Sequence, residues 1–287
     1  MRKPVVLAAA VLAAVAVFPV SARAGFTLSL KVSGGVGRLA LADANAVLKD
    51  WETWRIKEVE NNSKLTLVGD KVGAIHGGIN FDIELIMGFG RYLGLGLSTG
   101  ILQASLFESD AVVTVERPTG TFNYARTMSA SALEQLVSGY LRLPLGRLLG
   151  VYAKAGAGLL WGRFVDREAS KLTTGDKYSY PVSESAAGHG LVLAAGAGLT
   201  VAAAENLSFF IEGSARRAAL TNFTGETKAG VKGTLYAFEQ YDSKSSYWQR
   251  RFEVLEQEPS GPLDRNPGRA KIDFGGFSVR MGFALKF

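Results

Sequence analysis

The sequence predicts an all-β fold: a transmembrane, antiparallel, up-and-down β-barrel of eight strands, with a short helix in the first long loop. Apolar and polar residues alternate along eight segments, as in strands that have one apolar face. The connectors between these segments are alternately short and long. Membrane barrels show this alternation because short turns lie at one end of the barrel and longer loops at the other.

The last segment shows the alternation most clearly, because Phe277, Val279 and Met281 alternate there with Ser278 and Arg280. The predicted strands lie within residues 26–33, 78–85, 93–98, 133–143, 151–161, 191–201, 207–212 and 277–287. The short connectors are residues 88–92, 144–147 and 203–206, and the long ones are about 42–73, 107–129, 164–188 and 217–270. An even number of strands returns both ends of the chain to the same side of the membrane.

The composition excludes several classes of protein. The chain has 287 residues, of which 47% are hydrophobic and 20% are charged, so it is not disordered as a whole. It has no cysteine and only 2 histidines, which excludes disulfides and thiol catalysis and leaves little for a metal site or a catalytic triad. The net charge is +6, but three of the basic residues precede Gly25. The remainder is therefore close to neutral, which argues against nucleic-acid binding.

The N-terminus has the layout of a cleaved secretory signal peptide. Two basic residues, Arg2 and Lys3, precede an apolar run from Val5 to Val17, and a small-x-small site follows at residues 22–24. The run is shorter than the ~20 residues that a spanning helix needs, so we expect cleavage rather than anchoring. The expected domains are a signal peptide at 1–24 and a barrel domain at 25–287.

The first long connector contains a predicted helix from Asp43 to Val59. Its apolar residues recur at helical spacing on one face, at Ala44, Val47, Leu48, Trp51 and Trp54. Two interpretations remain open. The helix is a lid or an interfacial helix, since tryptophan favours the membrane–water boundary, or it packs across the rim of the barrel.

The longest connector, residues 217–270, is rich in aromatic and charged residues. We expect it to form a protruding hairpin or a surface-recognition patch. Its segment from Gln249 to Glu258 carries too many charges for a lipid-facing strand. A ten-stranded barrel is therefore the less favoured alternative.

The chain resembles the eight-stranded outer-membrane barrels, the class that contains the OmpA transmembrane domain, OmpX and OmpW. The final strand carries the resemblance, because Phe283, Leu285 and Phe287 form an alternating apolar pattern like the signal read by the barrel-assembly machinery. The resemblance implies a bacterial outer-membrane location, with export through the inner membrane. The implied partners are outer-membrane lipid, lipopolysaccharide and the assembly machinery, with a small hydrophobic ligand as a further possibility.

Each predicted strand also has a face opposite its apolar one, and these faces place ten charged residues in the lumen. They are Lys31, Asp82, Glu84, Glu134, Arg142, Lys154, Glu212, Arg216, Arg280 and Lys286. A lumen formed by eight strands is only wide enough to be filled by side chains, and unpaired charges there are costly, so we expect ion pairs. Glu212 and Arg280 should be neighbours, offset in height by about two residues. The network is either a plug that closes the lumen or the lining of a narrow, gated conduit.

No constellation of residues indicates an enzyme. A barrel deacylase of lipid A has a histidine two residues before a serine, and neither His76 nor His189 has a serine there. We expect no catalytic, cofactor or metal site. The predicted function is a structural or surface-recognition role, and the alternative is a narrow channel or transporter for small or hydrophobic molecules, as in OmpW-like barrels. An apolar pocket that opens sideways near the outer rim would favour transport, and a solid lumen under ordered loops would favour recognition.

Overall fold

The computed structural model describes residues 25–73, 77–104, 110–172, 179–227 and 229–287. The expected signal peptide and His76 lie outside the described residues. Within them the fold is an antiparallel β-sheet with one helix. That helix is not long and apolar enough to cross a membrane.

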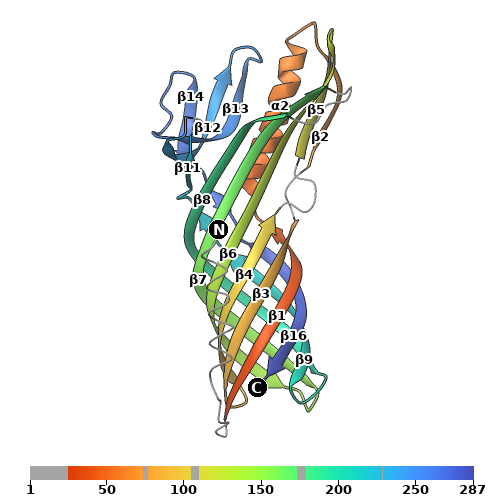
Figure 1. Ribbon diagram of the computed structural model, residues 1–287, viewed down its shortest axis with the longest axis vertical. Helices are drawn as coiled ribbons and strands as arrows, with labels where there is room; N and C mark the ends of the chain where they lie inside the picture. Colours follow the sequence, from red (N-terminus) through yellow and green to blue (C-terminus); the bar gives the residue numbers. More distant parts are fainter. Residues whose placement is uncertain (1–24, 74–76, 105–109, 173–178, 228) are drawn as a thin grey trace.

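Eight strands pair in a closed antiparallel ring (Figure 1). In ring order they are β1 Phe26–Leu39, β3 Gly77–Phe89, β4 Leu93–Ala104, β6 Gly120–Pro144, β7 Leu149–Leu172, β8 Ser179–Ala202, β9 Leu207–Arg217 and β16 Gly276–Lys286. Consecutive ring strands are neighbours, and β16 pairs with β1 to close the ring. Each predicted strand segment lies within one of these strands, except that Phe287 follows the end of β16.

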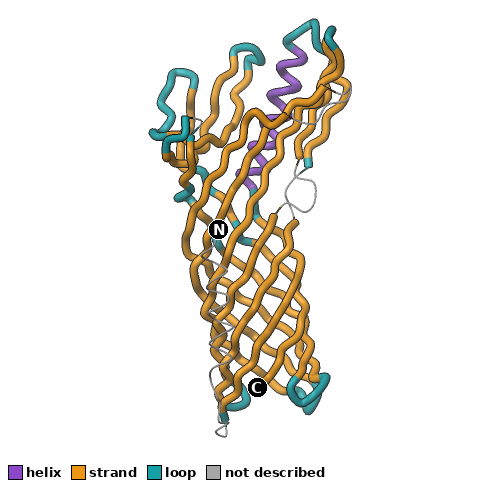
Figure 2. The backbone as a smooth tube through the Cα atoms, in the orientation of Figure 1, coloured by secondary structure: helices purple, strands orange, loops and turns teal. Residues whose placement is uncertain are grey.

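Short turns join the ring strands at one end of the molecule (Figure 2). Gly90, between β3 and β4, has a φ of 66°, and Gly146, between β6 and β7, has a φ of 119°. L side chains rarely adopt these backbone angles, so glycine is suited to both turns. The third short turn, residues 203–206, joins β8 to β9.

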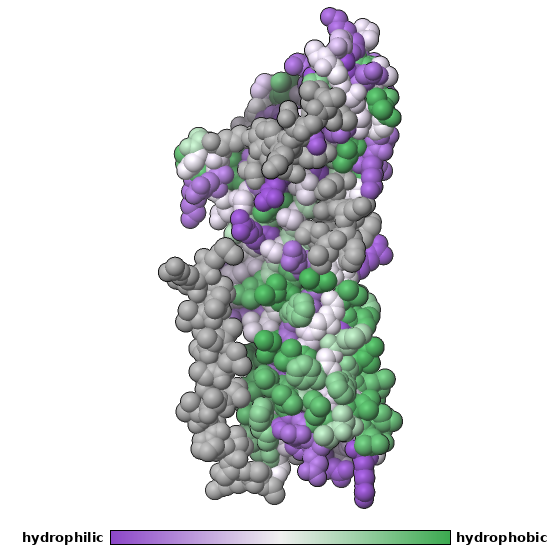
Figure 3. All heavy atoms as spheres, turned by 45° about the vertical axis from the view of Figure 1, so that its right-hand side comes forward, coloured by the Kyte–Doolittle hydropathy of each residue, from purple (hydrophilic) through white to green (hydrophobic). Residues whose placement is uncertain are grey.

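The outer wall of the ring is apolar. On the face of the ring drawn in Figure 3, hydrophobic residues form a band, with a hydrophilic edge at the short-turn end. Large apolar side chains with high exposure form this band, among them Val36, Phe81, Ile83, Leu97, Val137, Leu159, Leu193, Phe209, Phe277 and Met281. Such a surface is unusually apolar for a protein in water but fits the hydrocarbon region of a bilayer.

Three ring strands continue well beyond the ring and form an extension. Strands β6, β7 and β8 have 25, 24 and 24 residues, whereas ~9–11 residues are enough for a strand to cross a membrane. The two connectors expected at 107–129 and 164–188 are therefore mostly strand rather than loop. Two shorter strands, β2 Thr66–Val72 and β5 Asp110–Arg117, widen the sheet along the upper part of β6.

The other two long connectors are also ordered into secondary structure. The last contains β10 Ala219–Leu220, β11 Thr224–Glu226, β12 Lys232–Asp242, β13 Tyr247–Leu255 and β14 Asp264–Arg269, and β15 Ile272–Asp273 follows directly after it. Strands β12 and β13 form the expected protruding hairpin, which pairs with β8 only through β11. The charged segment from Gln249 is thus largely a strand, but it stands outside the ring.

The helix α2 Ala42–Glu60 forms where the sequence predicts it. It packs against β13, β5 and β2 of the extension rather than across the rim of the ring. Val47, Leu48 and Trp51 are fully buried there. The long strands provide a second sheet surface above the ring, and the apolar face of the helix covers it.

The main hydrophobic core therefore lies in the extension. Phe164 of β7 packs edge-on against Phe252 of β13, with ring centroids 5.4 Å apart. These residues, Trp51 of α2 and Leu235 of β12 belong to one buried cluster. The lumen of the ring, in contrast, is filled largely by polar and charged side chains.

Candidate functional site: the charged lumen

Two fully buried carboxylates lie at the centre of the lumen, Glu84 on β3 and Glu212 on β9. Lys31 donates to Glu212 at 2.6 Å, and its Nζ lies 3.9 Å from Glu84. Lys154 donates to Glu84 at 3.0 Å and lies 3.4 Å from Glu212. The two lysines thus bridge both carboxylates across the lumen.

Arg280 on β16 is a further cation that pairs with Glu212. Its guanidinium donates to Glu212 and lies 3.9 Å from Asp82. The central cluster consequently contains three cations, Lys31, Lys154 and Arg280, and three carboxylates, Asp82, Glu84 and Glu212. Balanced charge matters here because a buried ion without a partner is strongly destabilising.

Two tyrosines belong to the same network. Tyr152 donates to Glu212 at 2.8 Å and accepts a hydrogen bond from Lys31 at 2.9 Å. Tyr140 donates to Glu84 at 2.5 Å. Neither tyrosine was predicted from the sequence, because the prediction of lumen residues rested on charged side chains alone. The alternation contained the signal, since Tyr140 and Tyr152 have the inward parity of Arg142 and Lys154.

Glu212 and Arg280 are directly opposite each other in the register of β9 and β16. The expected offset of about two residues is wrong, because it was counted from the strand ends without the stagger between the strands. Glu134 and Arg216 form a second pair in the lumen, with Oε2 and Nε 2.5 Å apart.

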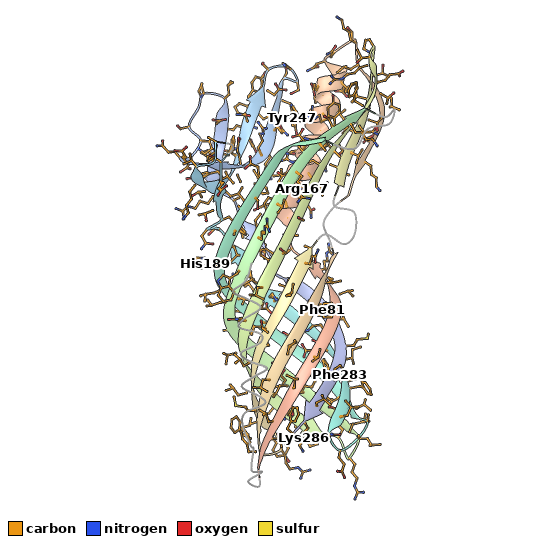
Figure 4. All side chains as sticks on the ribbon, viewed as in Figure 1. Phe81, Arg167, His189, Tyr247, Phe283 and Lys286 are labelled. Atoms are coloured by element: carbon orange, nitrogen blue, oxygen red, sulfur yellow. The ribbon has the colours of Figure 1, made fainter. Side chains whose placement is uncertain are left out.

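The remaining two expected lumen residues do not join these clusters. Arg142 is half-buried and Lys286 is exposed, and both line a cavity of about 340 Å³ at the short-turn end. Lys31, Tyr140 and Tyr152 also line this cavity, so the charged network forms its inner limit. Figure 4 shows Lys286 at this end of the barrel.

The other residues considered in the sequence have simpler surroundings. His189 is exposed on β8, and its backbone N–H donates to Asn222. Within the described ranges, no group of three or more potential ligands could hold a metal ion. Phe283 is exposed on the wall, Leu285 is half-buried, and Phe287 follows β16 with its backbone N–H bonded to Leu28.

A closed antiparallel ring with an apolar wall and a charged interior is the reverse of a water-soluble fold. In water the apolar side chains would be inside, whereas this ring exposes them and buries its ions. These features define the protein as a β-barrel of the outer-membrane class.

Comparisons with known proteins add two structural likenesses. One is Ail, the attachment invasion locus protein of Yersinia pestis, solved in complex with the heparin analogue sucrose octasulfate. The match has a TM-score of 0.33 and 12% sequence identity, and it covers 91% of this chain and 97% of that chain. The other is the RagAB peptide transporter, with a TM-score of 0.20 at 9% identity, over 92% of this chain and 41% of that chain. No protein-family model and no curated protein matches the chain. The class therefore rests on the strand ring and its apolar wall.

Proposed function

We propose that the protein is an integral outer-membrane protein with a structural or surface-recognition role, built on an eight-stranded transmembrane barrel that its own side chains close. The signal peptide at 1–24 delivers the chain, and residues 25–287 form the barrel domain. Phe283, Leu285 and Phe287 act as the assembly signal. Membrane lipid and lipopolysaccharide surround the apolar wall, and the extension faces the exterior.

One observation carries this proposal: the charged network spans the lumen between strands that are not neighbours in the ring. Lys154 on β7 reaches Glu84 on β3, and Lys31 on β1 reaches Glu212 on β9. Moving a solute through this layer would separate ions that are buried and paired, which is costly. The network therefore acts as a plug rather than as the lining of a conduit.

The extension supports a role at the surface. Its long strands, α2 and the β12–β13 hairpin share a buried apolar core, so they form a rigid projection. Polar contacts add to this core: Trp54 of α2 donates to Asp242 of β12 at 2.8 Å, and Arg55 donates to Glu168 of β7 at 2.5 Å. A preformed surface binds a partner at a lower entropic cost than mobile loops do.

A lateral hollow in the wall favours the alternative function, a route for hydrophobic molecules. A groove of about 390 Å³ lies between β3, β1 and β16, lined by Val36, Phe277 and Val279 together with Gly37 and Gly78. It lies towards the extension end of the apolar band. Arg38 is the one charged residue in its lining, so a hydrophobic molecule in the bilayer would meet mostly apolar and small side chains there.

Conductance tests whether the plug closes the lumen. In a planar bilayer, the purified protein should show no steady unitary conductance. The double variant Glu84→Ala and Lys154→Ala should conduct, because it removes two side chains from the centre of the plug. Glu205→Ala, at an exposed turn, is the control and should remain silent. Steady conductance by the unaltered protein would overturn the plug.

Surface recognition is tested by removing the hairpin alone. Replacing residues 232–255 by a short glycine-rich turn should leave the ring intact, since β12 and β13 pair with no ring strand. Cells that display the full protein should bind ligands on an array of glycans and proteins, and cells with the shortened protein should lose that binding. Identical profiles for the two, at equal surface levels, would contradict a recognition role for the hairpin.

A further inference from the structure

The cavity at the short-turn end is strongly basic. Five cations line it, Lys31, Arg91, Arg142, Arg147 and Lys286, against one acidic residue, Glu205. Its volume of about 340 Å³ is within the usual range for small-molecule sites. A concave surface with one sign of charge and apolar walls concentrates counter-ions.

Four of these cations, unlike the cations of the plug, have no carboxylate partner among the described residues. Lys31 is neutralised by Glu212, at 2.6 Å. No ion pair joins Arg91, Arg142, Arg147 or Lys286 to any acidic residue in the described part of the chain. The positive potential of the cavity is therefore not cancelled within the barrel.

Arg142 is the cation best placed to hold a ligand. It extends over the inward faces of Gly88 and Gly94, where a Cβ atom would lie 3.0 Å from its Nη1 and Nη2 atoms, respectively. Both glycines thus leave room for the guanidinium, and Tyr140 flanks it, with 5.7 Å between its Cζ and the ring centroid. The guanidinium is half-buried beside the plug yet has no carboxylate partner. Its planar fork matches two oxygens of an anion.

We propose that this cavity binds a phosphate group, with Arg142 as the inner ligand and Arg91, Arg147 and Lys286 as cations at the mouth. Phosphate fits better than a carboxylate because its charge and its oxygens can engage several cations at once. The phosphate belongs either to a soluble phosphate compound or to the headgroup of a phospholipid in the leaflet at this end. This inference goes beyond the plug and beyond the role of the extension.

The test uses the full barrel in a maltoside detergent, which contains no phosphate. Isothermal titration with inorganic pyrophosphate measures the soluble source, and titration with short-chain phosphatidylglycerol below its micellar concentration measures the lipid source. We expect saturable one-to-one binding of at least one probe. Arg142→Gln should weaken it at least tenfold, and Lys271→Gln, an exposed cation on the extension, should not change it. The probe that binds more tightly identifies the source.

A second variant guards against a folding defect in the first. Arg91→Gln combined with Arg147→Gln changes only exposed turn residues and should also weaken binding several-fold. Binding should decrease steeply with added salt. The proposal is overturned if neither probe binds, or if folded Arg142→Gln protein and the double variant both bind as tightly as the unaltered protein.

Discussion

Glu212 of β9 and Arg280 of β16 are register partners, and the guanidinium of Arg280 donates directly to the carboxylate of Glu212. Both side chains are buried, at 0% and 6% exposure. The same carboxylate accepts hydrogen bonds from Lys31 of β1 and Tyr152 of β7, so Glu212 links four strands of the ring. Its contribution to stability should therefore depend strongly on its partners.

Removing Glu212 alone should be strongly destabilising. Glu212→Ala leaves Lys31 and Arg280 without their closest carboxylate, and the expected loss in unfolding free energy is ~3–5 kcal/mol. Glu212→Ala with Arg280→Ala should cost less than the sum of the two single changes. Urea unfolding in lipid vesicles measures this double-mutant cycle, and additive losses would contradict the coupling.

Charged substitutions on the apolar wall should lower the folding stability of the barrel. Ile83→Arg and Phe209→Arg, at exposed positions of the band, should each cost ~2–4 kcal/mol near the membrane midplane and less towards the interface. Gly94→Arg should be disfavoured for another reason, because an added Cβ atom would lie 3.2 Å from the backbone oxygen of Met87 and the new cation would be placed beside Arg142. Folding free energies that do not respond to charge at either wall position would show that this face is not in lipid.

The contact between α2 and the hairpin should weaken in acid. Burial disfavours the charged form of Asp242, but hydrogen bonds from Trp54 and Ser245 outweigh it and hold the pKa of Asp242 below its ordinary value of 3.8. A lowered carboxyl pKa stabilises the folded contact above pH 3.8, and this stabilisation is lost as the pH falls through the lower folded value. The indole N–H resonance of Trp54 should therefore shift below about pH 3.8. The assignment would be contradicted if the midpoint of this pH-dependent change lay above pH 3.8, or if the Asp242→Asn variant showed the same pH dependence of the resonance.

A destabilised extension should unfold locally while the ring stays folded. Phe164 is 1% exposed and contacts Phe252, so Phe164→Ala should cost ~3–5 kcal/mol through the cavity that it creates. Limited proteolysis should then cut the extension faster while the ring stays protected by detergent. Leu191→Ala, at a side chain 76% exposed on the wall, is the control. Equal cleavage rates in the two variants would argue against an independent core.

The local patterns in the sequence predicted the ring strands and the helix because strand alternation and helical spacing are short-range properties. The alternation along Phe277, Val279 and Met281 is sufficient to identify a wall strand. Residues 164–188 were predicted to be a loop but are mostly strand, since strands outside a membrane bury one face against protein and expose polar residues on the other. Their polar composition therefore looked like a loop.

The sequence by itself determined which face of each ring strand is apolar, and with it the outer-membrane class of barrel and the inward position of Glu212, Arg280 and Lys31. Only the tertiary structure decided the register of β9 against β16, the membership of Tyr140 and Tyr152 in the network, and the packing of α2 on the extension. Stagger between strands depends on how the whole ring closes, and a hydrogen bond across the lumen joins residues far apart in the chain. Neither property is encoded in the spacing of neighbouring residues.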